Sequence, residues 1–404
     1  MKHGFLPALA LPLLASGPQP MTLNEAVATA ASSHPLIAAA RRSIESARGL
    51  ERQARLTFNP RLNLQVENLR IPGAPFVYGR DTDNFAFLQQ TFETAGKRGL
   101  RGDVAARQIR RSELELQILE RSIRLRVTEA WWRALAAQRA RELIEETLKT
   151  FEQTVEYHRV RVQEGAMAEA DLIRVQVEAG RFALAANEAA LAAAQARIEL
   201  FREMGQAVFP EVALEGALRA AEIPRWPPIE QAAERRPEIA LARATLDQAI
   251  ARERLEEANA RPNVDLLGGY KRNAGFDTAL AGLQIDIPVR NRNQGNIEAA
   301  SAEIRVARAN LAAAEALVEA EVRAARADFE TRSMQVRDYF PRLLEQAGET
   351  ARIARGAYRL GGAELLRLLD AERLRLEIEL LYARALAEFE QSAARYRFAL
   401  GELP

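Results

Sequence analysis

The chain has 404 residues, with 56 lysines and arginines against 55 aspartates and glutamates, and no cysteine. The balanced charge argues against nucleic acid as the main partner, because nucleic-acid binding needs a basic excess. The missing cysteines exclude disulfides, thiolate metal sites and a catalytic thiol, and three histidines make a multi-histidine metal site unexpected. A mean hydropathy of -0.23 is typical of a water-soluble protein, and no run reaches the ~18 apolar residues of a membrane-spanning helix.

The first 17 residues have the pattern of a secretory signal peptide. Lys2 supplies a basic start, an apolar stretch follows up to Leu14, and the small residues Ala15 and Gly17 fit the positions before a cleavage site. The alternative is a disordered apolar N-terminus of a cytosolic protein. We expect export on the basis of the signal-peptide pattern. The absence of cysteine fits a bacterial envelope, where disulfides are optional.

The rest of the chain consists of two copies of one plan. His34-Pro35 recurs as Arg236-Pro237, 202 residues later, whereas the segment from Val162 recurs at Tyr358, 196 residues later. The second copy is therefore shorter between these positions, and we expect the loss in the loop between its two strands. The expected divisions are a signal peptide over 1–17, a first repeat over 18–209, a proline-rich linker over 210–228 and a second repeat over 229–404.

Each copy is predicted to begin with a helix and continue with a β-hairpin. In the first copy the helix runs from Thr22 to about Leu56, opens with a capping box between Thr22 and Glu25, and ends before Pro60. Alternating apolar and polar residues then predict a hairpin at about 60–92. The corresponding parts of the second copy are a helix at about 237–260 and a hairpin at about 262–288.

Long helices follow each hairpin, at about 100–203 and about 297–400. The first has no proline from Leu100 to Gln163, which would make it on the order of 95 Å long at ~1.5 Å per residue. In the second, kinks are expected at Pro341, Gly348 and Gly356. Apolar residues recur every seven positions, which predicts coiled-coil seams rather than a globular core. The three series are Ile109, Leu116, Ile123 and Ala130; Val177, Leu184, Leu191 and Ile198; and Ile297, Ile304, Leu311 and Val318.

Two hairpins supply four strands, which are too few to close a transmembrane barrel. In an exported protein, strands with one apolar and one polar face favour a barrel with lipid outside and water inside. The chain would then pool its strands with further copies, giving eight strands in a dimer and twelve in a trimer. The alternative is an ordinary soluble four-stranded sheet packed on helices. A small barrel attached to long helices also explains the soluble-looking composition.

The order of motifs resembles the TolC family of bacterial outer-membrane efflux channels, from Thr22 to about Leu400. The opening helix with His34-Pro35-Leu36-Ile37 is similar to that of the family. Two strand-to-helix junctions, Gln90 to Arg101 and Ile287 to Gly295, resemble the heavy-metal branch named after CzcC. Tyr358 to Gly362, followed by Leu368 to Arg373, resembles the helical turn at the family's tip.

The resemblance implies a mainly α-helical homotrimer with a small membrane β-barrel. Twelve strands would form the barrel in contact with outer-membrane lipid, and an α-helical barrel would extend through the periplasm. Such a passive duct works with a periplasmic adaptor and an inner-membrane resistance–nodulation–division pump, here for metal cations. Many relatives carry a lipidated N-terminal cysteine, and this sequence has none.

A duct needs no catalytic, cofactor or metal site, and we predict none. The family's tip meets the adaptor, and the matching residues here are Val162, Gly165, Ala166, Met167, Tyr358, Leu360, Gly361 and Gly362. Nearby acids that could ring the pore and attract cations are Glu164, Glu169, Asp171, Glu364 and Asp370. These acids could equally be carboxylates favoured at helix starts by the helix dipole.

Other functions are compatible with the same sequence pattern. A channel for drugs or for type I protein secretion would share most of the pattern, and a soluble periplasmic coiled-coil scaffold would share the heptads. The segment Gly96 to Gly99 is expected to turn the strand into the helix, with Lys97, Arg98 and Arg101 near the membrane surface; the alternative is plain solvated residues. His34 is expected to be structural.

Overall fold

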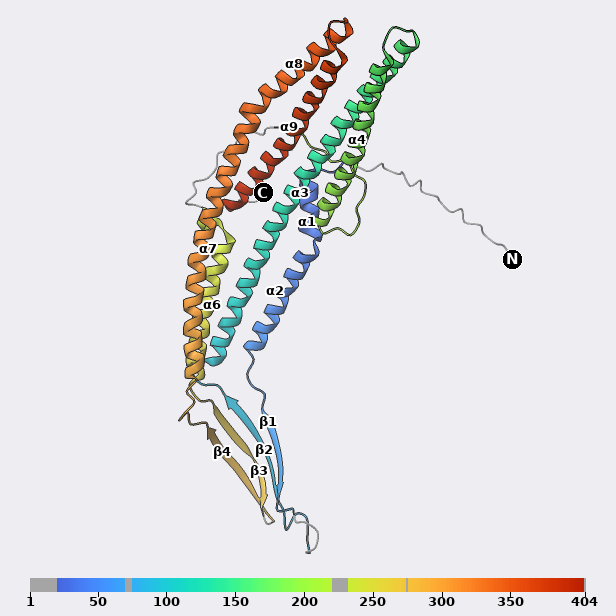
Figure 1. Ribbon diagram of the computed structural model, residues 1–404. Helices are drawn as coiled ribbons and strands as arrows, with labels where there is room; N and C mark the ends of the chain where they lie inside the picture. The colour runs from blue at the N-terminus through green and yellow to red at the C-terminus, as the bar shows by residue number, and fades with distance from the viewer. Residues whose placement is uncertain (1–19, 70–74, 220–231, 274, 403–404) are drawn as a thin grey trace, which may run out of the picture. The chain divides into compact units, whose positions relative to one another are not determined.

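The computed structural model describes residues 20–69, 75–219, 232–273 and 275–402, whose helices and strands follow the order labelled in Figure 1. The expected signal peptide, and the part of the expected linker from residue 220 onward, lie outside these residues. The chain divides into two compact units. Neither unit coincides with one sequence copy, because each takes segments from both.

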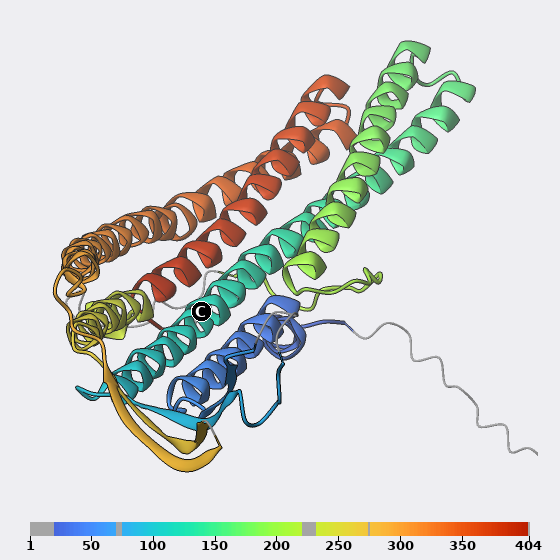
Figure 2. The same cartoon turned by 90° about the horizontal axis from the view of Figure 1, so that it is seen from below.

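The first unit includes described residues 20–36, 120–219 and 322–402. Its elements are α1 (Leu23–Ser33), α4 (Glu169–Glu203), α8 (Phe340–Arg359), α9 (Leu365–Ala399) and the C-terminal parts of α3 (Lys97–Gln163) and α7 (Gln294–Met334), joined to α8 by a π-helical turn, η2 (Gln335–Tyr339). Helices α3 and α4 form one hairpin and α8 and α9 another, and the two hairpins lie side by side (Figure 2). Trp131 and Phe389 are buried in this unit's core.

Residues 23–54 form two helices, so the prediction of one helix from Thr22 to about Leu56 was wrong. Helix α1 ends at Ser33, and α2 (Pro35–Ala54) begins directly after His34. His34 has an extended backbone, with φ -65° and ψ 125°, because the ring of Pro35 disfavours the α region for the residue before it. The second copy breaks at the matching place, where Arg236 is extended before Pro237.

The second unit includes described residues 37–69, 75–119, 232–273 and 275–321. Its elements are most of α2, α5 (Ala232–Arg235), α6 (Pro237–Asn259), the N-terminal parts of α3 and α7, β1 (Arg61–Glu67), β2 (Asp83–Phe92), β3 (Val264–Asn273) and β4 (Phe276–Ile285). Polar side chains join its helices. Arg111 donates to the amide oxygen of Gln248 at 2.7 Å, and Gln248 donates to Gln108 at 3.1 Å, which links α6 to α3.

The two hairpins form one antiparallel sheet in the order β1-β2-β3-β4. The central pairing of β2 with β3 joins the two sequence copies. At its middle Gly269 lies opposite Phe87, and a Cβ there would come within 2.4 Å of the Phe87 Cα atom, so only glycine fits. The connection from Glu67 to Asp83 is much longer than that from Asn273 to Phe276, and the second copy is therefore shortened in its hairpin loop as expected.

The sheet has two chemically different faces, because directly paired residues share a face. One face carries exposed apolar side chains: Leu62, Leu64, Val66, Leu88, Leu266, Tyr270, Leu283 and Ile285. The other carries mainly polar ones, among them Arg61, Asn63, Gln65, Gln89, Thr91, Asp265, Lys271 and Gln284. Leu64 is 72% exposed. In the described chain, β1 and β4 each have a strand partner on one side only.

The first strand-to-helix junction is built around a buried lysine. Lys97 donates to the carbonyl oxygen of Arg261 and, at 2.6 Å, to the side-chain oxygen of Asn263. Arg101 forms an ion pair with Glu93. Lys97 and Arg101 therefore stabilise the turn from strand to helix, and of the two alternatives the one with plain solvated residues is wrong for them.

The predicted seven-residue stripes differ in how deeply the protomer buries them. Ile304 and Val318 on α7 are buried, as a packed seam requires. On α4, however, Val177, Leu184, Leu191 and Ile198 are all exposed, Leu184 by 67%. Their helix instead buries Val175 and Phe182. The α4 stripe thus has no packing partner within the described protomer.

We predict that Gly205→Ala destabilises the first unit by about 2 kcal/mol or more. Gly205 has φ +73°, and an added Cβ would meet His34 Cδ2 and Pro35 Cδ at 2.7 Å. The matched control is Gly180→Ala in the interior of α4, where nothing lies within 4 Å of the new Cβ. The control should be neutral or stabilising by up to about 1 kcal/mol, because alanine favours the helix. Thermal unfolding of both variants decides, and equal midpoints would contradict the prediction.

Candidate functional site

The turn between α3 and α4 follows a helix-ending motif that depends on glycine. Gly165, with φ +70°, donates its N–H to the carbonyl oxygen of Val162 at 3.0 Å. Ala166 donates to the carbonyl oxygen of Arg161 at 2.9 Å. This pair of bonds is the Schellman motif, which satisfies the last carbonyl groups of a helix while the chain reverses.

The turn between α8 and α9 repeats this geometry 196 residues later. Gly361, with φ +75°, donates to the carbonyl oxygen of Tyr358 at 3.1 Å, and Gly362 donates to that of Ala357 at 2.8 Å. The two tips of the first unit are therefore built by the same backbone chemistry. The sequence match between the two turns reflects a shared structural need for glycine in the left-handed region.

The eight tip residues named by resemblance lie at or next to these two turns. Leu360 is the most exposed of them, at 89%. Val162, Met167 and Tyr358 are half-buried. The structure thus places the eight on two neighbouring turns of one unit, as Figure 1 shows for the ends of the two hairpins.

A buried histidine links the two hairpins near the tips. The His158 Nδ1 atom lies 2.8 Å from the Thr154 carbonyl oxygen, so this nitrogen carries the proton and donates. The Nε2 atom of the same ring lies 2.7 Å from the Tyr358 hydroxyl oxygen, within hydrogen-bond distance. Burial raises the pKa of Tyr358, and the nearby Asp171 adds to this shift, so the hydroxyl keeps its proton.

The sequence does not predict this contact. Tyr358 is expected as a tip residue, but His158 has no predicted role, because a single histidine on a long helix carries no pattern. Its partner lies 200 residues away, on the other copy. The repeat is the one signal in the sequence for this contact. Because α3 and α8 end in the same turn motif, residues near their ends can be expected to lie close together.

Apolar and ionic contacts also hold the hairpins together below the turns. Residues of α3 and α4 pack against α9 in one cluster: Leu143, Phe151, Val175, Phe182, Leu365, Leu369 and Leu376. Beside this cluster the buried carboxylate of Glu178 on α4 pairs with Arg373 on α9. A buried charge is stable only when it is paired, so this contact fixes how the two helices meet.

The five candidate pore acids are spread over both turns. Glu169 and Asp171 lie in the first turn of α4, where the helix dipole favours them. Glu364 is the N-cap residue of α9 but makes no capping bond. The Asp370 carboxylate lies 3.5 Å from the Arg373 guanidinium. Glu164 is exposed in the turn between α3 and α4. The helix-start explanation therefore fits Glu169 and Asp171 well, and it does not account for Glu164.

The described residues hold no group of three or more histidine, aspartate or glutamate side chains that could bind a metal ion. No helix within the described ranges is both long and apolar enough to cross a membrane.

Comparison with known proteins assigns the family. The family described as "Outer membrane efflux protein" matches residues 26–206 and 229–402, which is most of the chain. The cobalt-zinc-cadmium resistance protein CzcC of Cupriavidus metallidurans is 26% identical, over 95% of this chain and 90% of CzcC. The nickel-cobalt-cadmium resistance protein NccC of Alcaligenes xylosoxydans is 27% identical, over 64% of this chain and 59% of NccC.

Solved structures show the same fold. The crystal structure of CusC matches with a TM-score of 0.79 and 19% identity, over 94% of this chain and 92% of that one. A membrane protein from Pseudomonas aeruginosa matches with a TM-score of 0.78 and 20% identity, over 94% and 90% of the two chains. The resemblance to the CzcC-like branch is confirmed by the two metal-resistance relatives. The chain therefore belongs to the outer membrane efflux protein family, a family of passive channels, and it is an outer-membrane efflux channel.

Proposed function

We propose that three copies of this chain form the exit duct of a tripartite efflux system in the outer membrane. The duct takes metal cations from an inner-membrane resistance–nodulation–division pump through a periplasmic adaptor. The observation that carries the proposal is the two-faced sheet, whose exposed apolar face and open edges suit a shared barrel. Channels of this family work as trimers with such partners.

The strand arrangement supports closure with other copies. In hydrocarbon every backbone N–H and C=O must have a partner, so the open edges of β1 and β4 have to be paired. The strands alternate in direction, which makes β4 of one copy antiparallel to β1 of the next. Three copies give twelve strands, a number within the range of known antiparallel barrels. The apolar face then meets lipid and the polar face lines the lumen.

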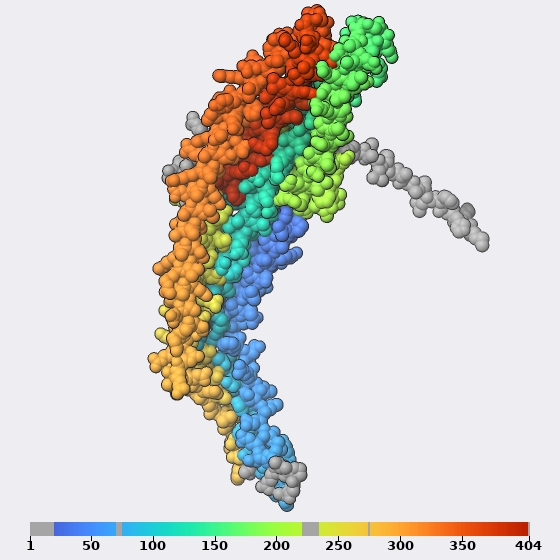
Figure 3. Space-filling model, viewed as in Figure 1, coloured from blue at the N-terminus to red at the C-terminus, as the bar shows by residue number. Residues whose placement is uncertain are grey.

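The exposed stripe on α4 supports contact between copies in the helical part. Figure 3 shows α4 along the surface of the first unit. Its apolar residues keep the seven-residue spacing of a coiled-coil seam, yet none is buried in the protomer. A second exposed stripe on α9 consists of Leu366, Leu374 and Leu381. We assign both stripes to contacts with neighbouring copies, because a chain that closes a ring needs two complementary sides.

The two turns form the periplasmic tip in this proposal. Exposed residues at the turns, foremost Leu360, contact the adaptor, and the acids of both turns give the entrance a negative character. Glu164 is the best candidate for a pore acid, because neither a helix dipole nor an ion pair accounts for it. Threefold symmetry would repeat each carboxylate three times around the pore and attract cations.

Metal cations are the cargo that the relatives favour. The names of CzcC and NccC refer to resistance to cobalt, zinc, cadmium and nickel. This chain has three histidines and five methionines, which offer little soft-metal ligation. We therefore assign the choice of metal to the pump and only passage to the duct. Drug export and protein secretion remain outcomes of the test below.

We predict that Leu64→Arg blocks insertion of the sheet into the membrane. Leu64 lies on the apolar face, and an arginine facing lipid costs about 2–4 kcal/mol near the bilayer centre. The control is Gln65→Arg, one residue along on the polar face, which should insert normally. The amount of protein in purified outer membranes measures the effect, and equal amounts of both variants would contradict the assignment of faces.

We predict that Leu184→Glu weakens the trimer, because it places a charge in the seam that α4 forms with a neighbouring copy. The control Ala192→Glu adds the same charge at an exposed position of α4 that lies away from the stripe, about 80° around the helix from Leu184. Native mass spectrometry of the detergent-extracted protein should show monomers only for the first variant. A stable Leu184→Glu trimer would show that the stripe does not lie between copies.

We predict that loss of the gene lowers tolerance to cobalt, zinc and cadmium and leaves tolerance to hydrophobic drugs unchanged. Growth inhibition of a deletion strain and its complemented parent measures both. A strain that becomes drug-sensitive but keeps its metal tolerance would contradict the metal assignment and favour the drug-efflux alternative. A strain that secretes less of a protein would favour type I secretion.

A further inference from the structure

The connections between the sheet and the helices of the second unit lie at one end of the sheet. Phe92 at the end of β2 is paired with Val264 at the start of β3, which is paired with Ile285 at the end of β4. Figure 1 shows the chain passing from this end into the helices. The connections are residues 55–60, 93–96, 260–263 and 286–293. Together with Phe92, Ile285 and Arg98 they form what we call the rim.

Side-chain contacts hold the rim in place against the sheet and α3. The Thr94 hydroxyl donates to the Pro262 carbonyl oxygen at 2.5 Å, which joins the second connection to the third. The side-chain amide of Gln90 donates to the Phe58 carbonyl oxygen at 3.0 Å. The Arg101 guanidinium lies 5.7 Å from the centre of the Phe58 ring, within cation–π distance. The rim is therefore one continuous surface rather than a set of separate loops.

Exposed apolar side chains follow the rim. Phe92 and Ile285 lie on the apolar face of the sheet, at its last level before the helices. The apolar character continues beyond the strands, at the exposed residues Leu56, Phe58, Ile287 and Val289. Of these, Ile287 is 81% exposed. The surface that the proposed barrel turns toward lipid therefore extends onto the rim.

Arginines share the rim with these apolar side chains. Two basic residues have acidic partners, because Arg55 pairs with Glu51 and Arg101 pairs with Glu93. Four other arginines are exposed, and in the described part of the chain none of their guanidinium groups forms an ion pair: Arg98, Arg261, Arg290 and Arg292. The connections contain one exposed acid, Asp286. The rim therefore carries a positive charge.

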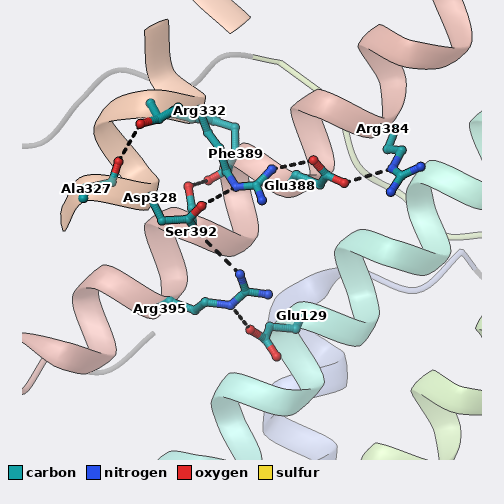
Figure 4. Close-up of polar contacts among 10 residues, drawn as sticks. Glu129, Ala327, Asp328, Arg332, Arg384, Glu388, Phe389, Ser392 and Arg395 are labelled. Atoms are coloured by element: carbon teal, nitrogen blue, oxygen red, sulfur yellow. Dashed lines mark hydrogen bonds and ion pairs between the residues drawn. The ribbon is translucent and has the colours of Figure 1, made fainter. Parts of the chain in front are cut away.

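Arginines of the first unit illustrate the alternative, in which the protein supplies the anion. In Figure 4, Arg332 pairs with Asp328 at 2.7 Å and also with Glu388. Arg384 pairs with the same Glu388 at 2.9 Å. Charge-assisted bonds of this kind satisfy the guanidinium groups within the protein. The four arginines of the rim lack such partners.

The far end of the sheet also supplies its own anions. Arg80 pairs with Asp81 at 2.9 Å, and the Arg272 guanidinium lies 3.9 Å from the Asp277 carboxylate. These are the arginines that the structure describes at that end. The two ends of the sheet thus differ, because the arginines at the far end are paired within the protein and those of the rim are not.

The lengths of the strands place the rim at the surface of the membrane in the proposed barrel. Strands β2, β3 and β4 have 10 residues each, which is the length of a tilted strand that crosses the hydrocarbon core. Residues just beyond Phe92 and Ile285 then lie at the level of the lipid headgroups. An arginine there keeps its aliphatic stem against apolar side chains and donates paired hydrogen bonds to a phosphate group.

We propose that the rim binds anionic phospholipids of the membrane leaflet that faces the periplasm, with phosphatidylglycerol as the simplest ligand. The arginines bind the phosphate of the headgroup, and the exposed apolar residues pack against the acyl chains. A lipid fits both kinds of residue, whereas an acidic protein would leave the apolar ones uncovered. This inference rests on the proposed barrel for the level of the rim, but its test does not require a working channel.

The variant Arg290→Gln/Arg292→Gln tests the proposal, and its matched control is Arg305→Gln/Arg308→Gln. Each removes two positive charges from exposed positions, one pair on the rim and the other on α7. The control positions lie about 16 Å or more beyond the start of α7, at ~1.5 Å per residue. This distance exceeds the ~8 Å over which exposed charges act at physiological salt.

Native mass spectrometry of the detergent-extracted full-length protein measures the outcome. The protein is mixed with equal amounts of phosphatidylglycerol and phosphatidylcholine that have the same acyl chains, and the ratio of the two bound lipids is determined. We expect the unchanged protein and the control to prefer phosphatidylglycerol, and the rim variant to lower this ratio at least about fivefold. An unchanged ratio in the rim variant, or an equal loss in the control, would overturn the proposal.

Excess inorganic phosphate in the same experiment identifies the source of the anion. Phosphate should leave the bound lipid in place, because it has no acyl chains to pack against the apolar residues. Displacement of phosphatidylglycerol by phosphate would contradict the assignment to a lipid. The outcome is separable from that of the proposed function: if Leu64→Arg and Gln65→Arg behave as predicted and the lipid ratio does not change, only this inference fails.

Discussion

The rest of the structure depends on one constraint in the sheet. In the described chain, the outer edges of β1 and β4 have no neighbouring strand to pair their backbone N–H and C=O groups. An apolar face directed at lipid excludes water, so unpaired edge N–H and C=O groups would cost several kcal/mol each. Strand pairing with further copies is the solution we propose, and duplication suits it, because two hairpins give an even number of strands per chain. The same proposal accounts for the exposed stripe on α4, since copies that shared a barrel would also pack along their helices.

Duplication supplied one backbone plan and let the side chains diverge. Both copies end their long helices with the same glycine turn, at Gly165 and Gly361, and their following helices with another, at Gly205 and Gly401. At each strand-to-helix junction a side chain donates to a backbone carbonyl group near the end of the copy's first helical region, but the donor residue differs between the copies. In the first copy Arg101 donates to the Leu56 carbonyl oxygen at 3.3 Å, and in the second Asn293 donates to that of Glu256 at 2.7 Å. Pro341 is a divergence of another kind, because it follows the π-helical turn η2, whereas α3 is α-helical throughout.

Local rules predicted the parts of the fold that depend on neighbouring residues. The capping box of Thr22 and Glu25, the turn glycines and the period-two strands are all present. The helix break at His34 obeys a rule that the prediction applied at Pro60 and overlooked at Pro35. Contacts between distant residues could not be predicted: nothing near His158 points to Tyr358, and nothing near Lys97 points to Arg261. The α4 stripe is predicted to be a packed seam, yet it is exposed in the described protomer, and a periodic pattern does not say whether its partner is in the same chain.

The central claim is that several copies of this chain share one barrel. Cryo-electron microscopy of the full-length protein in lipid nanodiscs tests it most directly. We expect threefold particles with a twelve-stranded barrel, in which β4 of each copy is hydrogen-bonded to β1 of the next and α4 lies between copies. Particles with a single four-stranded sheet, or with β1 and β4 left unpaired, would contradict it.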